Sequence, residues 1–142
     1  MKILLAVDGS KHSQHAVDCL IEHANWYRKK PEVELVTVHL PVPKVGGLGG
    51  GVNKAQVQKY YQEEGEASLA RAKKKLDAAK VPYTTRILVG PIAETLVAHA
   101  KSAGCDLIYV GTRGMSAAAN ALLGSTATKV LHLSTVPVLL VK

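Results

Sequence analysis

The sequence predicts a single α/β domain, doubly wound and Rossmann-like, with a five-stranded parallel sheet of strand order 3-2-1-4-5 and helices on both faces. Two observations predict this fold. The 142 residues suffice for one domain with one sizeable core, because a domain typically has about 150 residues. Short apolar runs also alternate strictly with longer segments of helical periodicity, and this alternation favours parallel strands joined by right-handed crossovers.

The chain opens with a buried strand that leads directly into a helix. Residues 3–7 are an unbroken apolar run that ends at Asp8-Gly9-Ser10, a turn whose serine is a good helix N-cap. Over residues 12–29 apolar side chains recur at intervals of three and four, which predicts one core-facing helical stripe. Pro31 ends this helix.

A long helix lies between the second and third predicted strands. Residues 33–40 are β-branched and apolar, as in a strand. The glycine-rich segment 46–51 follows and is expected to be a mobile loop. A helix is predicted over about residues 53–79, because its apolar residues fall on one face. Tyr83–Val89 form the third strand.

The last part of the chain repeats the alternation. Gly90-Pro91 opens a helix that Gly104 ends. Residues 106–110 form the fourth strand, and a small-residue segment follows it. The last helix is predicted over Ser125–Leu133 and the last strand over Val138–Val141.

Composition excludes several classes of protein. The longest unbroken apolar run is residues 3–7. A membrane-spanning helix needs about 20 such residues and the core of a signal peptide at least about 7, so neither a membrane span nor a standard signal peptide is expected. Cys19 and Cys105 are the two cysteines, so a disulfide framework and a four-cysteine zinc site are excluded and a cytoplasmic location is expected. The net charge of +7 attracts polyanions in general. Its basic runs, 28–30 and 71–75, fit solvated helix surfaces, and no aromatic residues interleave with them as nucleic-acid binding requires.

The candidate chemistry lies in the turns after the first and fourth strands, because doubly wound sheets bind ligands where the strand order reverses. The fourth strand is followed by Gly111-Thr112-Arg113-Gly114, then nine residues, then Gly124-Ser125-Thr126 at the start of the last helix. Glycines let the backbone approach a phosphate, and a helix N-terminus with adjacent hydroxyls is an anion site. Each glycine alone also fits an ordinary turn or cap. The two clusters at this spacing are the more specific signal.

With this motif, Gly-x2-Gly-x9-Gly-Ser/Thr, the chain resembles the universal stress protein family in its ATP-binding branch. The resemblance covers the whole chain. Besides the motif, the segments that resemble the family are residues 2–10, 38–40, 105–111 and 136–141. It implies bound ATP, with Asp8 at the ribose and the adenine framed by Ala6, Val7 and Leu40. The phosphates would be held by Gly114, Gly124, Ser125 and Thr126, while Gly111, Thr112, Arg113 and Met115 belong to the same loop. Mg²⁺ would be held largely through the phosphates and water.

The resemblance further implies a homodimer paired through the terminal strand Val138–Val141. The predicted function is an ATP-binding sensor or regulator of the stress response. A slow ATPase and a nucleotide-independent partner-binding module are the alternatives. The loop offers Thr112, Arg113, Ser116 and Asn120 but no general base, and Asp8 is expected to be the only nearby acid, so at most weak hydrolysis is predicted.

Several residues keep a second interpretation. Asp8 can simply shape the turn into the helix, and Arg113 can face either phosphate or solvent. The segment 46–51 matches no phosphate-loop motif and is interpreted as a cover over the site or only a linker. His15, Cys19 and His23 have a spacing that could hold a soft metal, but a helix flank also explains them and no metal site is predicted.

Overall fold

The structure, a computed structural model, describes residues 1–43, 53–114 and 123–142. The glycine-rich segment 46–51 and three residues of the motif loop, Met115, Ser116 and Asn120, lie outside this description.

The core of the fold is a five-stranded parallel sheet of order β3-β2-β1-β4-β5. This confirms the predicted fold class and strand order. The strands are β1 (Lys2–Ala6), β2 (Glu32–His39), β3 (Tyr83–Val89), β4 (Leu107–Gly111) and β5 (Val138–Val141). The central strand β1 pairs with β2 on one side and with β4 on the other. The strand order therefore reverses between β1 and β4, as the sequence predicts.

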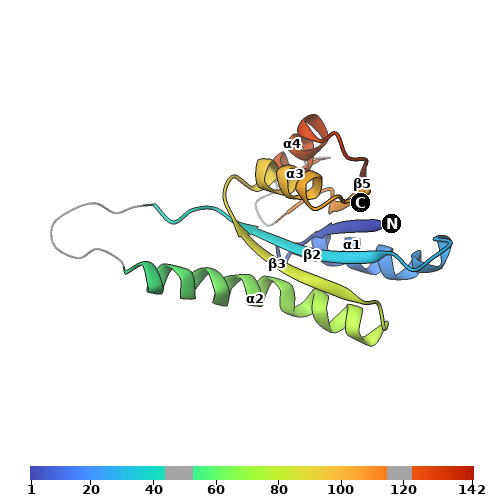
Figure 1. Cartoon of the computed structure of the whole chain (residues 1–142), viewed down its shortest axis with the longest axis horizontal. Helices are drawn as coiled ribbons and strands as arrows, with labels where there is room; N and C mark the ends of the chain where they lie inside the picture. The colour runs from blue at the N-terminus through green and yellow to red at the C-terminus, as the bar shows by residue number, and fades with distance from the viewer. Residues whose placement is uncertain (44–52, 115–122) are drawn as a thin grey trace.

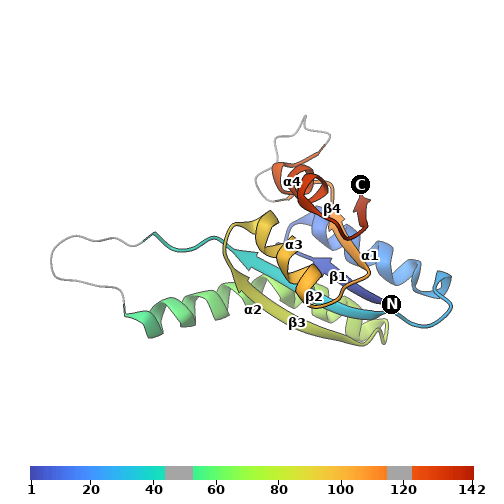
Figure 2. The same ribbon diagram turned by 45° about the horizontal axis from the view of Figure 1, so that its top comes forward.

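Helices cover both faces of the sheet, with α2 on one side and α3 and α4 on the other (Figure 1). They are α1 (Lys11–Glu22), α2 (Lys54–Ala78), α3 (Ile92–Ser102) and α4 (Ser125–Leu133), with a short 3₁₀ turn η1 (Ala24–Trp26) after α1. The same layers are seen in Figure 2 after rotation. The predicted helix over residues 12–29 is too long, because the chain turns at η1 and brings the Tyr27 hydroxyl within 3.0 Å of that of Tyr109.

Two apolar clusters hold the layers together. Val33 and Leu35 of β2 pack with buried residues of α1 and α2, whereas Val36 packs with buried residues of α3 and with Val130 of α4. This division follows from the strand's period of two, which sends successive side chains to opposite faces. The prediction that α2 has one core-facing stripe is also confirmed, since Leu69 and Leu76 are fully buried.

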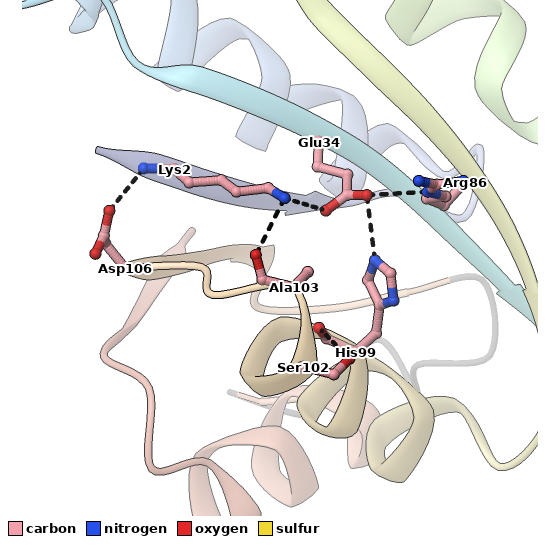
Figure 3. A network of polar contacts seen from close by, with 7 residues as sticks. All are labelled: Lys2, Glu34, Arg86, His99, Ser102, Ala103 and Asp106. Atoms are coloured by element: carbon pink, nitrogen blue, oxygen red, sulfur yellow. Dashed lines mark hydrogen bonds and ion pairs between the residues drawn. The ribbon is translucent and has the colours of Figure 1, made fainter.

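One charged residue is buried on the face under α3. Glu34 of β2 is 3% exposed, and Figure 3 shows it surrounded by Lys2, Arg86 and His99. Its Oε1 accepts from Arg86 Nε at 3.1 Å and lies 3.3 Å from His99 Nε2, while its Oε2 lies 3.5 Å from Lys2 Nζ. Burial alone would raise the pKa of Glu34, but the hydrogen bond from Arg86 and the nearby His99 and Lys2 hold that pKa below its usual range. These contacts tie α3 to three strands.

Within residues 1–43, 53–114 and 123–142, no helix combines the length and apolar character needed to cross a membrane.

Candidate functional site

A cavity of about 530 Å³ opens at the carboxyl edge of the sheet, where the strand order reverses. Most of the residues that the sequence assigns to the site line it: Ala6, Val7, Asp8, Leu40, Gly111, Arg113, Gly114, Gly124, Ser125 and Thr126. The structure therefore brings together turns that are more than one hundred residues apart in the chain. Met115 is outside the described residues.

Thr112 lies in the motif but is buried rather than part of the cavity lining. Its N–H donates to the Val141 carbonyl at 2.8 Å, and its carbonyl accepts from Gly124 N–H at 2.7 Å. The second bond joins the two ends of the motif directly. Thr112 thus positions the loop between β4 and α4 through its backbone.

The two walls of the cavity differ in chemistry. One wall is apolar and belongs to the face under α3 and α4, with Val36, Val38, Ile92 and Leu96 among its residues. The other wall belongs to the face under α1 and α2 and is polar. Its polar residues are Ser13, Thr37, His39, Glu64 and Ser68, and Val7 lies on the same face. A flat, apolar group fits the first wall, whereas hydroxyl groups fit the second.

Asp8 connects the turn after β1 to the turn after β4. Its Oδ1 accepts from the Ser10 N–H at 3.0 Å, so the turn-shaping role considered for this residue is present. Ser10 in turn caps α1, because its hydroxyl oxygen accepts from the Ser13 N–H at 3.2 Å. The other oxygen, Oδ2, faces the motif loop at Gly114.

Gly114 and Gly111 are glycines because neighbouring atoms leave no room for a side chain. A Cβ at Gly114 would lie 2.7 Å from Asp8 Oδ2. A Cβ at Gly111 would lie 2.8 Å from the carbonyl oxygen of His12 at the start of α1. Both distances are far below normal van der Waals contact. At Gly111 the neighbour is backbone, so only glycine allows this close approach, whereas a side chain at position 114 would require the Asp8 carboxyl to move.

The positive end of the cavity is the start of α4. Gly124 is the N-cap of this helix, and among the described residues no side chain caps its first turn. Ser125 and Thr126, the first two residues of the helix, line the cavity together with Arg113. The amide groups of a helix N-terminus carry a partial positive charge and bind anions. The arrangement can therefore hold a phosphate without any catalytic side chain.

Sequence reasoning missed the contribution of α2. Glu64 and Ser68 line the cavity, so the expectation that Asp8 is the only acid near the site is wrong. The two residues are four apart on one helix face, which is the signal that was available. The sequence does not say where α2 passes the site, because packing decides the path of the helix. Ser68 of α2 packs closely on the turn at Gly9, where a Cβ would lie 3.6 Å from Ser68 Cα.

Two of the three residues whose spacing could hold a metal, Cys19 and His23, contact each other directly. Cys19 Sγ lies 3.3 Å from His23 Nδ1, His15 is exposed, and burial raises the pKa of the Cys19 thiol. In the described part of the chain, no group of three or more His, Cys, Asp or Glu side chains could hold a metal ion.

Comparison with known proteins agrees with the fold. The family model described as the universal stress protein family matches residues 1–142. The universal stress protein YxiE of Bacillus subtilis is 34% identical over 149 residues, which cover 99% of this chain and 98% of that protein.

Two solved structures have the same fold along nearly the whole chain. The hypothetical protein MJ0577 superimposes with a TM-score of 0.78 at 25% identity, covering 99% of this chain and 94% of that one. A universal stress protein in complex with cAMP superimposes with a TM-score of 0.68 at 26% identity, covering 99% and 95%. The fold and the full-length matches agree, and the chain belongs to the universal stress protein family.

Proposed function

We propose that this protein binds ATP in the cavity at the carboxyl edge of its sheet and acts as a cytoplasmic, homodimeric sensor or regulator. The observation that carries the proposal is the polarity of the cavity. Its apolar wall suits an adenine, Asp8 beside Gly114 suits a ribose, and the start of α4 with Arg113 suits phosphates. The structural neighbour that holds cAMP supports an adenine nucleotide as the ligand class.

The glycines of the motif fit this ligand. Because Gly111 and Gly114 have no space for a Cβ, the loop backbone stays close to Asp8 and α1. A phosphate can then approach the N–H groups of Ser125 and Thr126, and the hydroxyls of these two residues supply further donors. Mg²⁺ would be held through the phosphates and water.

A slow ATPase is the first alternative. The structure adds Glu64 and His39 to the acid and base groups of the cavity. Both lie on the wall under α1 and α2, whereas the proposed phosphate groups lie at α4 on the other side of the sheet. We therefore expect slow or absent turnover. Single-turnover hydrolysis with Mg²⁺ tests this, and a rate of about 1 per second or faster would establish an enzyme instead.

Mass spectrometry of gently denatured protein tests the proposal against a nucleotide-independent partner-binding module. Co-purified ATP, or ATP retained after it is added and free ligand is removed, supports the proposed function. Protein that melts cooperatively yet retains no nucleotide under either condition supports the partner-binding alternative.

The proposed dimer rests on the exposed edge of β5. Among the described residues β5 pairs with β4 alone. Ile108 N–H donates to the Pro137 carbonyl and Thr112 N–H to the Val141 carbonyl, so the backbone groups of odd-numbered residues face β4. Those of Val138 and Leu140 consequently point away from the sheet, where a second β5 strand can pair with them.

A further inference from the structure

The polar wall of the cavity contains a carboxylate for which the ATP contacts proposed above have no use. Glu64 of α2 lines the same cavity as Asp8. The residues three and four positions from it on the helix are Tyr60, Tyr61, Ala67 and Ser68, none of them basic. Its charge is therefore not neutralised along its own helix.

Contacts on both sides of Glu64 fix the place of this part of α2 on the sheet. Three residues before it, the Tyr61 hydroxyl accepts from Val42 N–H at 2.6 Å, just beyond the end of β2. Four residues after it, Ser68 packs against the turn at Gly9, where a Cβ would lie 3.6 Å from Ser68 Cα. Between these contacts, a Cβ on Gly65 would lie 2.6 Å from Ile87 of β3, so the helix lies tightly on the sheet here.

This placement puts Glu64 outward of Asp8 along the cavity wall. Ser68 is the α2 residue next to the Asp8-Gly9 turn, and Glu64 is roughly 6 Å further toward the helix N-terminus. Figures 1 and 2 show that the N-terminal part of α2 extends beyond the carboxyl ends of the strands. A group attached to the ribose and directed toward α2 therefore meets Glu64 after it passes Asp8.

We infer that Glu64 is a specificity residue: it favours nucleotides with free ribose 2′ and 3′ hydroxyls and disfavours those that carry a phosphate monoester on either oxygen. The inference rests on the proposed function, with Asp8 at the ribose. Hydroxyls can donate to the carboxylate, or to it through water. A phosphate monoester at the same position has only acceptors and brings like charge toward two acidic side chains, of which Glu64 is exposed at the rim of the cavity.

The test compares two ligands with the same base and the same number of phosphates. ADP has both phosphates on the 5′ oxygen, whereas adenosine 3′,5′-bisphosphate has one on the 3′ oxygen. Calorimetric titration of the full chain should give an affinity for ADP at least about tenfold higher, since unit charges a few ångströms apart repel by this order in partly solvated surroundings. The preference should also decrease at high salt, because ions screen the repulsion.

The variant Glu64→Gln keeps the size of the side chain and removes its charge, so the preference for ADP should fall by about fivefold or more. Glu63→Gln is the matched control. Glu63 is the preceding residue on α2, its side chain is 65% exposed and it pairs with Lys59 rather than lining the cavity. The preference should be unchanged in this control.

Each outcome decides between the two proposals. If ADP binds but Glu64→Gln leaves the preference unchanged, or weakens both ligands equally, the role assigned to Glu64 is wrong while the nucleotide site stands. If neither ligand binds to folded wild-type protein, the nucleotide site fails and the specificity role fails with it.

Discussion

The proposed site depends on the close approach of the Asp8 carboxyl to Gly114. The two residues come from turns after different strands, and the Asp8 carboxyl occupies the space that a side chain at position 114 would need. The same carboxyl also accepts from Ser10 N–H at the start of α1. A change at either residue therefore alters both turns of the cavity.

The first prediction concerns Gly114→Asp. The new carboxylate collides with Asp8 and repels phosphate, so the affinity for ATP should fall by at least about 2 kcal/mol. Calorimetric titration measures it. The control is Gly104→Ala, at a glycine with φ of +66° and open space around the Cβ position, which should cost stability only. An unchanged ATP affinity in folded Gly114→Asp would remove the phosphate site from this loop.

The sequence was informative about site residues wherever a motif carried them. Asp8, Gly114 and Gly124 could be predicted because short-range spacing and strand ends mark them. Glu64 and Ser68 could not, since they lie within a long polar helix whose path across the sheet is decided by packing at Gly9 and Gly65. The division of the cavity into an apolar and a polar wall could not be predicted either, because it depends on which face of the sheet each lining residue lies on.

At the scale of elements, β2 shows how a buried strand accommodates a charge. An apolar, β-branched pattern predicted this strand correctly, but the pattern alone leaves Glu34 unexplained. Three neighbouring elements supply its partners: Lys2 from β1, Arg86 from β3 and His99 from α3 (Figure 3). A buried carboxylate is tolerated only with such partners.

The second prediction follows from the lowered pKa of Glu34. A carboxyl group whose pKa is lower in the folded state stabilises the fold above its unfolded pKa, and the contribution is lost as pH falls through the folded value. Glu34→Gln should therefore cost about 2 kcal/mol at pH 7, and the difference from wild type should shrink below about pH 4. Urea unfolding at several pH values measures it. A difference that is constant over this range, or an equal effect from exposed Glu32→Gln, would contradict the account.

The third prediction concerns the chain after α1. The Tyr109 hydroxyl is buried, and Tyr27 is its partner at 3.0 Å. Burial, with the bond to Tyr27, raises the pKa of Tyr109 well above its ordinary value. Tyr27→Phe should cost about 1–2 kcal/mol because it leaves a buried hydroxyl without its partner. The double variant with Tyr109→Phe should cost no more than Tyr27→Phe, and chemical unfolding of all four proteins gives the coupling. Strictly additive effects would mean that the bond does not shape this turn.

At the scale of the whole molecule, the parallel direction of the strands could be predicted because every crossover is a helix long enough to return the chain to the same edge. The boundaries were less accurate where tertiary contacts end an element, as at the end of α1. The cavity lies at the predicted switch point, the place between β1 and β4 where the strand order reverses. The position of the candidate site therefore follows from topology. Its chemistry follows from the residues that topology brings there.

The fourth prediction concerns assembly. Leu140→Pro removes an N–H that points away from β4, so it should disrupt pairing between chains while leaving the ladder to β4 intact. Analytical ultracentrifugation should give monomers. Val89→Pro is the control at the opposite edge, because Gly90 N–H donates to His39 and Val89 N–H therefore points outward. Thermal melts verify folding of both variants. A Leu140→Pro protein that remains dimeric, or a monomeric wild type at high concentration, would contradict pairing through β5.

The central claim is that the cavity at the switch point is a nucleotide site. Calorimetric titration of the wild-type chain with ATP and Mg²⁺, at two temperatures so that a small enthalpy cannot hide binding, tests it most directly. We expect saturable binding with one site per chain, lost or strongly weakened in Gly114→Asp. Wild-type protein that melts cooperatively but gives no saturable heat at either temperature would contradict it.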